Sequence, residues 1–261
     1  MNTRRTMLVA NWKMNKTVVE AVGWLNTFYP QAAERAAQQE LVEVAVCAPF
    51  TVLHPLYAAL RRLNSKVKLG AQDIFWQERG AFTGEISAEM LQEFQTKYVI
   101  CGHSERRVLL QESSEMVSRK CAAAVKAGIT PIVCVGESIS VRRGGLLLQW
   151  LEAQLYESLA FWDNQETIVV AYEPVWAIGT GQSATAADAE QACGYIRQVL
   201  RERAGDAADY ISILYGGGVT PENIGELLDC PNVDGALVGG ASLDPDAFGK
   251  IVLAGCKEPP K

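Results

Sequence analysis

Eight short apolar segments recur along the 261-residue chain, and stretches with helical periodicity lie between them. Each segment is nearly continuous in apolar residues instead of alternating, which is typical of parallel strands buried on both faces. The segments are Met7–Ala10, Val44–Ala48, Val67–Gly70, Tyr98–Cys101, Pro131–Val135, Ile168–Tyr172, Ile211–Tyr215 and Gly235–Val238. Strands that alternate with helices predict an α/β fold, either a closed (β/α)8 barrel or a doubly wound open sheet.

The stretches between these strands carry the expected helix signals. Apolar residues share one helical face in two sets, which are Ala21, Val22, Leu25 and Phe28, and Met116, Val117, Cys121 and Val125. Helix starts are predicted at Thr220-Pro221-Glu222 and at Asp244-Pro245-Asp246, where a capping side chain precedes proline.

No linker, Ser/Pro-rich tract or shift in composition divides the chain. Apolar residues make up 49% of it and charged residues 21%, which argues against intrinsic disorder. A single barrel commonly reaches this length. We therefore expect one domain over residues 1–261, with an active site at the C-terminal ends of the strands.

Charge and cysteine content exclude several classes of protein. A net charge of −6 argues against a nucleic-acid binder and against a polybasic membrane anchor. The N-terminal apolar segment is too short for a signal peptide or a membrane span. The seven cysteines form no CxxC pair, which disfavours a disulfide framework and a zinc site. We interpret them as buried thiols in a reducing cytoplasm.

Ionisable residues follow the first, fourth and sixth predicted strands. Lys13 is either a solvated loop residue or a cation aimed at a phosphate or a developing oxyanion. His103 is either structural or catalytic, and its place at a strand end favours catalysis, whereas we interpret His54 as structural. Glu173 ends an apolar strand, where burial is expected to raise its pKa towards that of a general base. The alternative for Glu173 is a salt bridge at the barrel mouth.

Glycine-rich turns follow the last two strands, at Gly216-Gly217-Gly218 and Gly239-Gly240. Backbone N–H groups exposed by glycine at helix starts bind anions, and the corresponding loops of (β/α)8 enzymes commonly bind phosphate. Most Gly-Gly pairs are simple turns, but two after the last two strands favour a phosphate site.

Together these motifs resemble the triosephosphate isomerase family in order and spacing, over essentially the whole chain. They are Asn11-Trp-Lys-Met-Asn15, Gly80-Ala-Phe-Thr-Gly-Glu85, Cys101-Gly-His-Ser-Glu-Arg-Arg107, Cys134-Val-Gly-Glu137, Ala171-Tyr-Glu-Pro-Val-Trp-Ala-Ile-Gly-Thr-Gly181 and Leu237-Val-Gly-Gly-Ala-Ser242. The resemblance implies a single (β/α)8 barrel and not an open sheet. It also implies a glycolytic and gluconeogenic enzyme that interconverts dihydroxyacetone phosphate and D-glyceraldehyde 3-phosphate through an enediolate.

The resemblance also implies roles for single residues. Glu173 is expected to be the base, and His103 a neutral electrophile whose imidazolium form is disfavoured by the helix N-terminus at Ser104. Lys13 is expected to stabilise the oxyanion, with Asn11 holding substrate oxygens and Glu105 orienting the lysine. N–H groups that contact phosphate are expected at Gly179, Gly218, Gly239 and Gly240.

The segment after Glu173 resembles the mobile lid of that family. Trp176 is expected to lie in this lid, and Tyr215 to meet its trailing hinge near Ala184 when the lid closes. The resemblance implies no metal or organic cofactor. It also implies a homodimer, formed through the loop around Thr83.

The sequence departs from the family pattern at two points. Gly218 stands where the family usually has serine, and the trailing hinge reads Gln182-Ser183-Ala184 where Lys-Thr-Ala is commoner. Two alternatives remain open at this point. One is a related isomerase for a four-carbon ketose phosphate, and the other is a sugar-phosphate-binding barrel without turnover.

Overall fold

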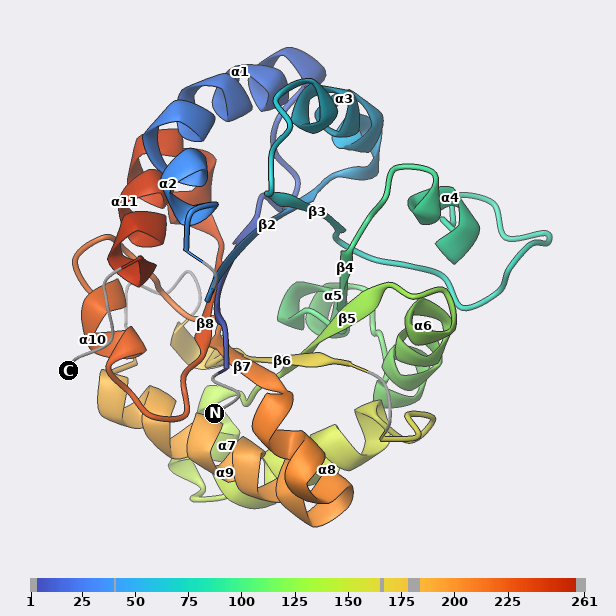
Figure 1. Cartoon of the computed structure of the whole chain (residues 1–261). Helices are drawn as coiled ribbons and strands as arrows, with labels where there is room; N and C mark the ends of the chain where they lie inside the picture. The colour runs from blue at the N-terminus through green and yellow to red at the C-terminus, as the bar shows by residue number, and fades with distance from the viewer. Residues whose placement is uncertain (1–3, 40, 165–166, 178–183, 257–261) are drawn as a thin grey trace.

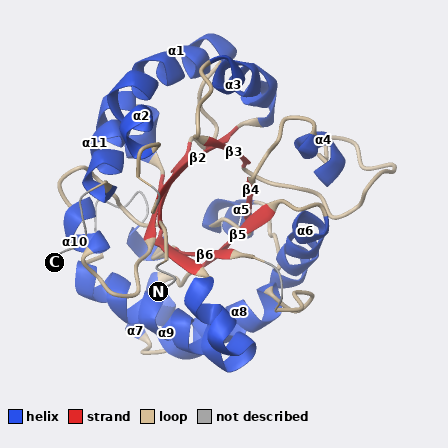
Figure 2. Ribbon diagram, in the orientation of Figure 1, coloured by secondary structure: helices blue, strands red, loops and turns tan. Residues whose placement is uncertain are grey.

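The computed structural model describes residues 4–39, 41–164, 167–177 and 184–256. It contains a closed barrel of parallel strands that pair in chain order, and the last strand pairs with the first. The strands form the inner ring in Figure 2. They are β1 (Thr6–Asn11), β2 (Val42–Ala48), β3 (Lys68–Ala71), β4 (Tyr98–Cys101), β5 (Thr130–Val135), β6 (Val169–Tyr172), β7 (Ser212–Tyr215) and β8 (Gly235–Val238).

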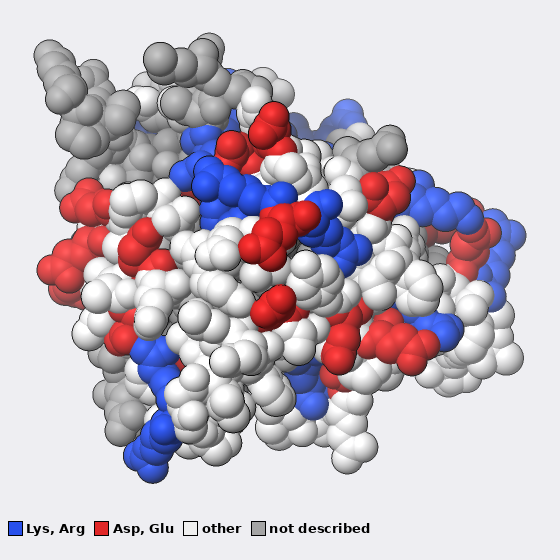
Figure 3. All heavy atoms as spheres, turned by 90° about the horizontal axis from the view of Figure 1, so that it is seen from below, with Lys and Arg blue, Asp and Glu red and all other residues white. Residues whose placement is uncertain are grey.

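Helices surround this ring on the outside (Figure 1). They are α1 (Val18–Phe28), α2 (Glu34–Ala36), α3 (Phe50–Arg62), α4 (Ala88–Gln92), α5 (Ser104–Leu109), α6 (Ser114–Lys126), α7 (Ile139–Arg143), α8 (Leu147–Ser158), α9 (Ala186–Ala204), α10 (Ile224–Leu228) and α11 (Pro245–Gly255). Shorter helical turns are η1 (Tyr29–Ala33), η2 (Val175–Ala177), η3 (Gly205–Tyr210) and η4 (Gly240–Leu243). On the outer face of α7, α8 and α9, acidic and basic side chains lie beside one another (Figure 3).

The strands are apolar on both faces because each face meets a different part of the core. Met7 and Val9 of β1 point into the barrel and pack with residues such as Ile100. Leu8 and Ala10 point outward and join the layer between strands and helices. This double burial explains why the predicted strands are continuous apolar runs.

The pairing of β1 with β8 selects the closed barrel over the open sheet. All eight predicted strands are present, and their ends differ from the prediction by no more than two residues. Val67 lies just before β3, and Asn11 extends β1 by one residue. Among the described residues, no helix has both the length and the apolar character needed to cross a membrane.

The two predicted helix starts differ in outcome. Asp244 caps α11 as predicted, because its side chain accepts hydrogen bonds from the N–H groups of Asp246 and Ala247. The prediction at Thr220 is wrong, because α10 begins only at Ile224. The side chain of Asn223 closes a turn there by accepting from the Thr220 N–H and donating to the Gly218 carbonyl.

Candidate active site

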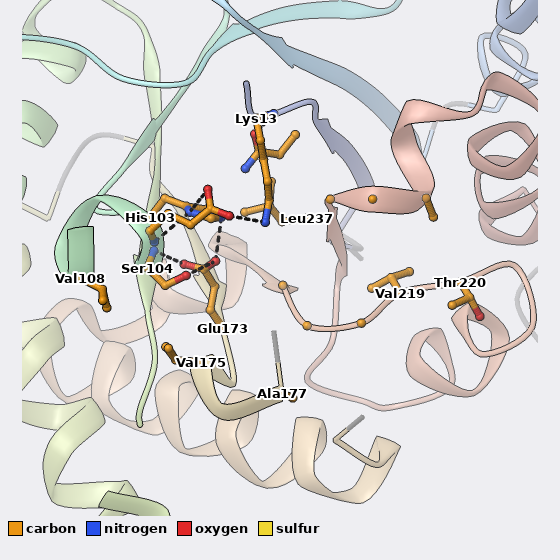
Figure 4. Close-up of a pocket in the computed structure, with 18 of the residues that line it drawn as sticks. Lys13, His103, Ser104, Val108, Glu173, Val175, Ala177, Val219, Thr220 and Leu237 are labelled. Carbon is orange, nitrogen blue, oxygen red and sulfur yellow. Dashed lines mark hydrogen bonds and ion pairs between the residues drawn. The ribbon is translucent and has the colours of Figure 1, made fainter. Parts of the chain in front are cut away.

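A pocket of about 670 Å³ opens at the C-terminal end of the barrel. It lies where β1, β4, β6, β7 and β8 end, as the sequence predicts. Figure 4 shows Lys13, His103 and Glu173 pointing toward one another inside it. Of the predicted site residues, the pocket is lined by Asn11, Lys13, His103, Ser104, Glu105, Glu173, Gly218, Gly239 and Gly240.

The carboxylate of Glu173 is fully engaged by its neighbours, and the residue is 1% exposed. One oxygen, Oε1, lies 2.9 Å from the His103 Nε2 and accepts from the Ser104 hydroxyl at 3.1 Å. The other oxygen accepts from the Ser104 backbone N–H at 2.9 Å. Two residues at the start of α5 therefore hold the carboxylate that ends β6.

These donors decide the pKa of Glu173. Burial raises it, but the imidazole of His103 and the two donors of Ser104 stabilise the anion more strongly, so the pKa lies below its usual value. The expectation of a raised pKa is therefore wrong for the ligand-free pocket. If the carboxylate moves away from these donors, the balance shifts toward burial and the group becomes a stronger base.

The orientation of His103 follows from its place as the N-cap of α5. The backbone N–H of Glu105 donates to Nδ1 at 3.3 Å, so Nδ1 is the acceptor of the ring. A single proton on this ring would therefore sit on Nε2, the atom that faces Glu173. A Glu105 carboxylate oxygen lies 3.5 Å from Nδ1, but that side chain also pairs with Lys13.

Lys13 is the only Lys or Arg among the described residues that line the pocket. Its ammonium lies 2.6 Å from the Glu105 carboxylate. Its backbone has a φ of 52°, in the left-handed region that a non-glycine residue adopts at a cost. The Asn11 side chain accepts from its N–H, and the Gln72 side chain donates to its carbonyl at 2.8 Å. These contacts hold the strained backbone and aim the ammonium into the pocket.

Glycines allow the loops after β7 and β8 to approach the ionisable side chains closely. A Cβ at Gly216 would lie 3.0 Å from the Glu173 Cγ, and one at Gly239 would lie 3.2 Å from the Lys13 Cε. At Gly218, by contrast, a Cβ would meet no atom of the described residues within 4 Å. As far as the described part of the chain goes, the glycine at 218 therefore leaves open space in the pocket wall.

Two of the predicted supporting residues lie behind the pocket. The Trp176 indole, in η2, donates to the Glu137 carboxylate at 2.7 Å, and the Arg142 guanidinium lies 5.0 Å from its ring. The Tyr215 hydroxyl is buried and has no hydrogen-bond partner among the described residues. Gly179 and the Gln182–Ser183 part of the hinge lie outside the described residues.

No role for Glu137 was predicted from the sequence, although this residue ends the family-like motif Cys134-Val-Gly-Glu137. The side chain is fully buried and accepts from Tyr172, Trp176 and Arg142. Burial raises its pKa above the usual value, against the effect of these donors. The available signal was a carboxylate close after an apolar strand, since Glu137 follows the last residue of β5 by two positions, much as Glu173 follows β6.

A buried network of charges behind α5 was also missed. Lys120 is 2% exposed and contacts Asp73 at 2.6 Å and Glu112 at 2.7 Å. Arg106 joins both carboxylates, and Glu112 also accepts from the Gly102 N–H next to His103. The network connects the loop after β3 to the turn that carries the imidazole. The described residues contain no group of three or more His, Cys, Asp or Glu side chains arranged to hold a metal ion.

Comparison with known proteins gives a consistent result. The family model described as triosephosphate isomerase matches residues 6–255. A triosephosphate isomerase of Dehalococcoides mccartyi (strain BAV1) is 48% identical over 249 residues, which cover 95% of each chain. One of Synechococcus sp. (strain JA-3-3Ab) is 46% identical over 95% of this chain and 94% of that protein.

A solved structure agrees with these sequence matches. The crystal structure of triosephosphate isomerase from Bartonella henselae superposes with a TM-score of 0.84 at 38% identity. The match covers 96% of this chain and 98% of that chain. Fold, family model and relatives coincide over nearly the full length, and the chain belongs to the triosephosphate isomerase family.

Proposed function

We propose that this chain interconverts dihydroxyacetone phosphate and D-glyceraldehyde 3-phosphate by proton transfer through an enediolate intermediate, in glycolysis and gluconeogenesis. One observation carries the proposal. A carboxylate, an imidazole and an ammonium converge on one pocket beside glycine loops that leave room for a phosphate. A barrel that only bound sugar phosphates would not need the carboxylate base.

Glu173 is the proposed base. It removes a proton from the carbon next to the substrate carbonyl and returns that proton to the neighbouring carbon. Its reach is limited to a short movement, because its stem packs under Gly216. Leaving the donors of Ser104 and His103 raises its proton affinity at the moment when it faces the substrate.

His103 and Lys13 are proposed to stabilise the charge that develops on the substrate oxygens. The Nε2–H of His103 becomes free to donate to an oxygen when Glu173 moves away. The Lys13 ammonium offsets both the oxyanion and the phosphate, with Glu105 orienting it and Asn11 holding oxygens. No metal or organic cofactor is needed for these steps.

Backbone N–H groups are proposed to bind the phosphate at Gly179, Gly218, Gly239 and Gly240. The segment that follows Trp176 is the proposed lid. The Tyr215 hydroxyl supports this proposal, because it is buried without a hydrogen-bond partner among the described residues, which is costly unless another state satisfies it. We propose the backbone near Ala184 as its partner in the closed state.

The low pKa of Glu173 predicts the pH profile. Because the pKa of Glu173 in the free enzyme lies below its usual value, protonation of this carboxylate should limit kcat/KM only at a pH below that usual value. Ser104→Ala removes one donor to the anion, so the acid limb should move to higher pH. Ser118→Ala, a buried serine away from the pocket, is the control and should leave the limb in place. If Ser104→Ala does not shift the acid limb of the kcat/KM profile, titration of Glu173 is not the cause of that limb.

Gly218→Ser tests the departure from the family pattern. The added Cβ meets open space, and the hydroxyl supplies a further donor to phosphate. We expect inorganic phosphate to inhibit up to about tenfold more tightly, since such a bond contributes roughly 0.5–1.5 kcal/mol. Turnover should be similar or modestly faster. Gly218→Ala separates the hydroxyl from the Cβ, and weaker inhibition of Gly218→Ser would show that this loop binds phosphate differently.

Initial rates with two substrates test the proposed reaction itself. D-Glyceraldehyde 3-phosphate and a four-carbon ketose phosphate are compared side by side, with Glu173→Gln as the blank. We expect kcat/KM for the triose to approach the diffusional ceiling of about 10⁸ M⁻¹s⁻¹. A faster four-carbon rate would instead assign the chain to the alternative substrate, and the open space at Gly218 would be its cause.

A homodimer is proposed through the loop around Thr83, in the segment between β3 and α4 that projects from the barrel (Figure 1). Two exposed apolar side chains support an interface here. Phe82 in this loop is 43% exposed, and Met14, the residue after Lys13, is 97% exposed. Phe82→Asp should give a monomer in sedimentation and lower the activity, because burying a charge at an interface is costly. Phe161→Asp, which changes an exposed phenylalanine elsewhere, should remain dimeric. A monomeric parent chain would contradict the proposal.

We further propose that residues 1–261 act as one domain in the cytoplasm. The seven cysteines support this location, because all are free thiols and most are buried. Burial raises the pKa of Cys47 and Cys193, which keeps these thiols protonated and unreactive.

A further inference from the structure

A second hollow, of about 430 Å³, lies at the opposite end of the barrel, where the strands begin. Its ionisable lining consists of Arg4, Arg5, Lys68, Lys97 and Glu43, and we call it the basic hollow. Its volume is within the range of small-ligand sites. The described lining thus has four cations and one carboxylate, in a chain whose net charge is −6.

The two arginines and the carboxylate are already paired. Arg4 forms an ion pair with Asp234, and Arg5 lies 2.8 Å from the Glu43 carboxylate. The Tyr98 hydroxyl donates to the other oxygen of Glu43. The carboxylate of Glu43 is therefore occupied and does not neutralise the remaining cations of the basic hollow.

The side chains of Lys68 and Lys97, by contrast, form no hydrogen bond or ion pair with any described residue. Lys68 begins β3 and Lys97 directly precedes β4. The Lys97 N–H donates to the Leu69 carbonyl at 2.8 Å, so the two lysines stand at the starts of neighbouring strands. Two ammonium groups that line one hollow repel each other, and an anion bound between them removes this repulsion.

Neutral donors complete the lining of the basic hollow. Thr130, Thr167 and Ser212 contribute hydroxyl groups, and the ring of Tyr210, which is 59% exposed, stands at the edge. Ammonium and hydroxyl groups together are the usual donors to phosphate oxygens. A single phosphate satisfies one lysine well, whereas two linked phosphates reach both.

We propose that the basic hollow binds a pair of linked phosphate groups, with Lys68 and Lys97 as its principal cations. The site is separate from the proposed active site and does not depend on the isomerase activity. Linked phosphates can come from free pyrophosphate or from a nucleoside diphosphate. If the ligand is a nucleoside diphosphate, its nucleobase stacks on the ring of Tyr210, and adenosine diphosphate then binds more tightly than pyrophosphate.

Calorimetric titration of the full chain with pyrophosphate and with adenosine diphosphate tests the proposal. The titrations use about 0.01 M salt, where charges act over about 30 Å. The test variant is Lys68→Ser with Lys97→Ser. The matched control is Arg143→Ser with Lys250→Ser, which removes two exposed positive charges elsewhere. A Lys13→Met chain identifies binding in the active-site pocket.

We expect pyrophosphate to bind the basic hollow of the parent, the control pair and Lys13→Met alike. The Lys68/Lys97 variant should bind about tenfold or more weakly, because each lysine supplies a charged hydrogen bond. Its isomerase activity should be unchanged. Equal affinity of the Lys68/Lys97 variant and the parent would overturn the proposal, as would an equal loss in the control pair. Loss of binding in Lys13→Met alone would locate the ion in the active site and also overturn it.

Discussion

Replacing Glu173 by Gln should lower kcat by about 10²–10⁴-fold, the usual cost of losing a general base. The amide has the shape of the carboxylate and still accepts from the Ser104 N–H, so the fold of the pocket should persist. It has no proton affinity at neutral pH, and the carbon-bound proton therefore has no acceptor. The proposed phosphate donors are the glycine loops and Lys13, which this substitution leaves in place, so phosphate binding should remain near the parent value.

Three measurements separate the loss of the base from a damaged fold. Steady-state rates give kcat, inhibition by inorganic phosphate reports the pocket, and exchange of the substrate proton with deuterated solvent reports the base directly. Glu173→Gln should lose turnover and exchange together and keep phosphate inhibition. Unchanged turnover would exclude Glu173 as the base, and retained exchange would assign proton removal to another group.

The second large effect is expected for Lys13→Met, which removes the only Lys or Arg that lines the described part of the pocket. Loss of one group that stabilises an oxyanion typically costs about 10²–10³-fold in kcat. The phosphate also loses its countercharge, so KM should rise as well. The methionine stem still fits under Gly239, because it is no longer than the lysine stem that packs there.

Lys16→Met is the matched control for Lys13→Met. Lys16 lies three residues away, is partly exposed and donates to the Leu243 carbonyl instead of facing the pocket. It should keep kcat and KM close to the parent values. Equal losses in the two variants would show that overall charge at this end of the barrel, and not the ammonium of Lys13, supports catalysis.

The fold was predictable because its strongest signal is repeated. Each strand is buried on both faces, so an apolar run such as Tyr98–Cys101 stands out without knowledge of its neighbours. The apolar runs alone did not separate the closed barrel from an open sheet, since the pairing of β1 with β8 joins segments more than 220 residues apart, and the family resemblance favoured the barrel. The late start of α10 was missed because a side chain, Asn223, closes a turn that reads as a helix cap.

The site residues were predictable as positions at strand ends, but their electrostatics were not. Donors from Ser104, 69 residues earlier, lower the pKa of Glu173, whereas burial raises it. No local sequence pattern shows which of these two effects is larger. Lys120 was hidden because it sits in an otherwise apolar helical face, between Val117 and Cys121. Its partners come from the loop after β3 and from the segment before α6, and only the fold brings them together.

The pairing of β8 with β1 also has a consequence for the chain while it is being made. A closed ring has no strand edge that can pair with another molecule, but this protection requires every strand. Until Gly235–Val238 has been synthesised, β1 and β7 each present an unpaired edge to other chains. The final ladder therefore forms only after β8 has been synthesised, and until then the two open edges can pair with other chains.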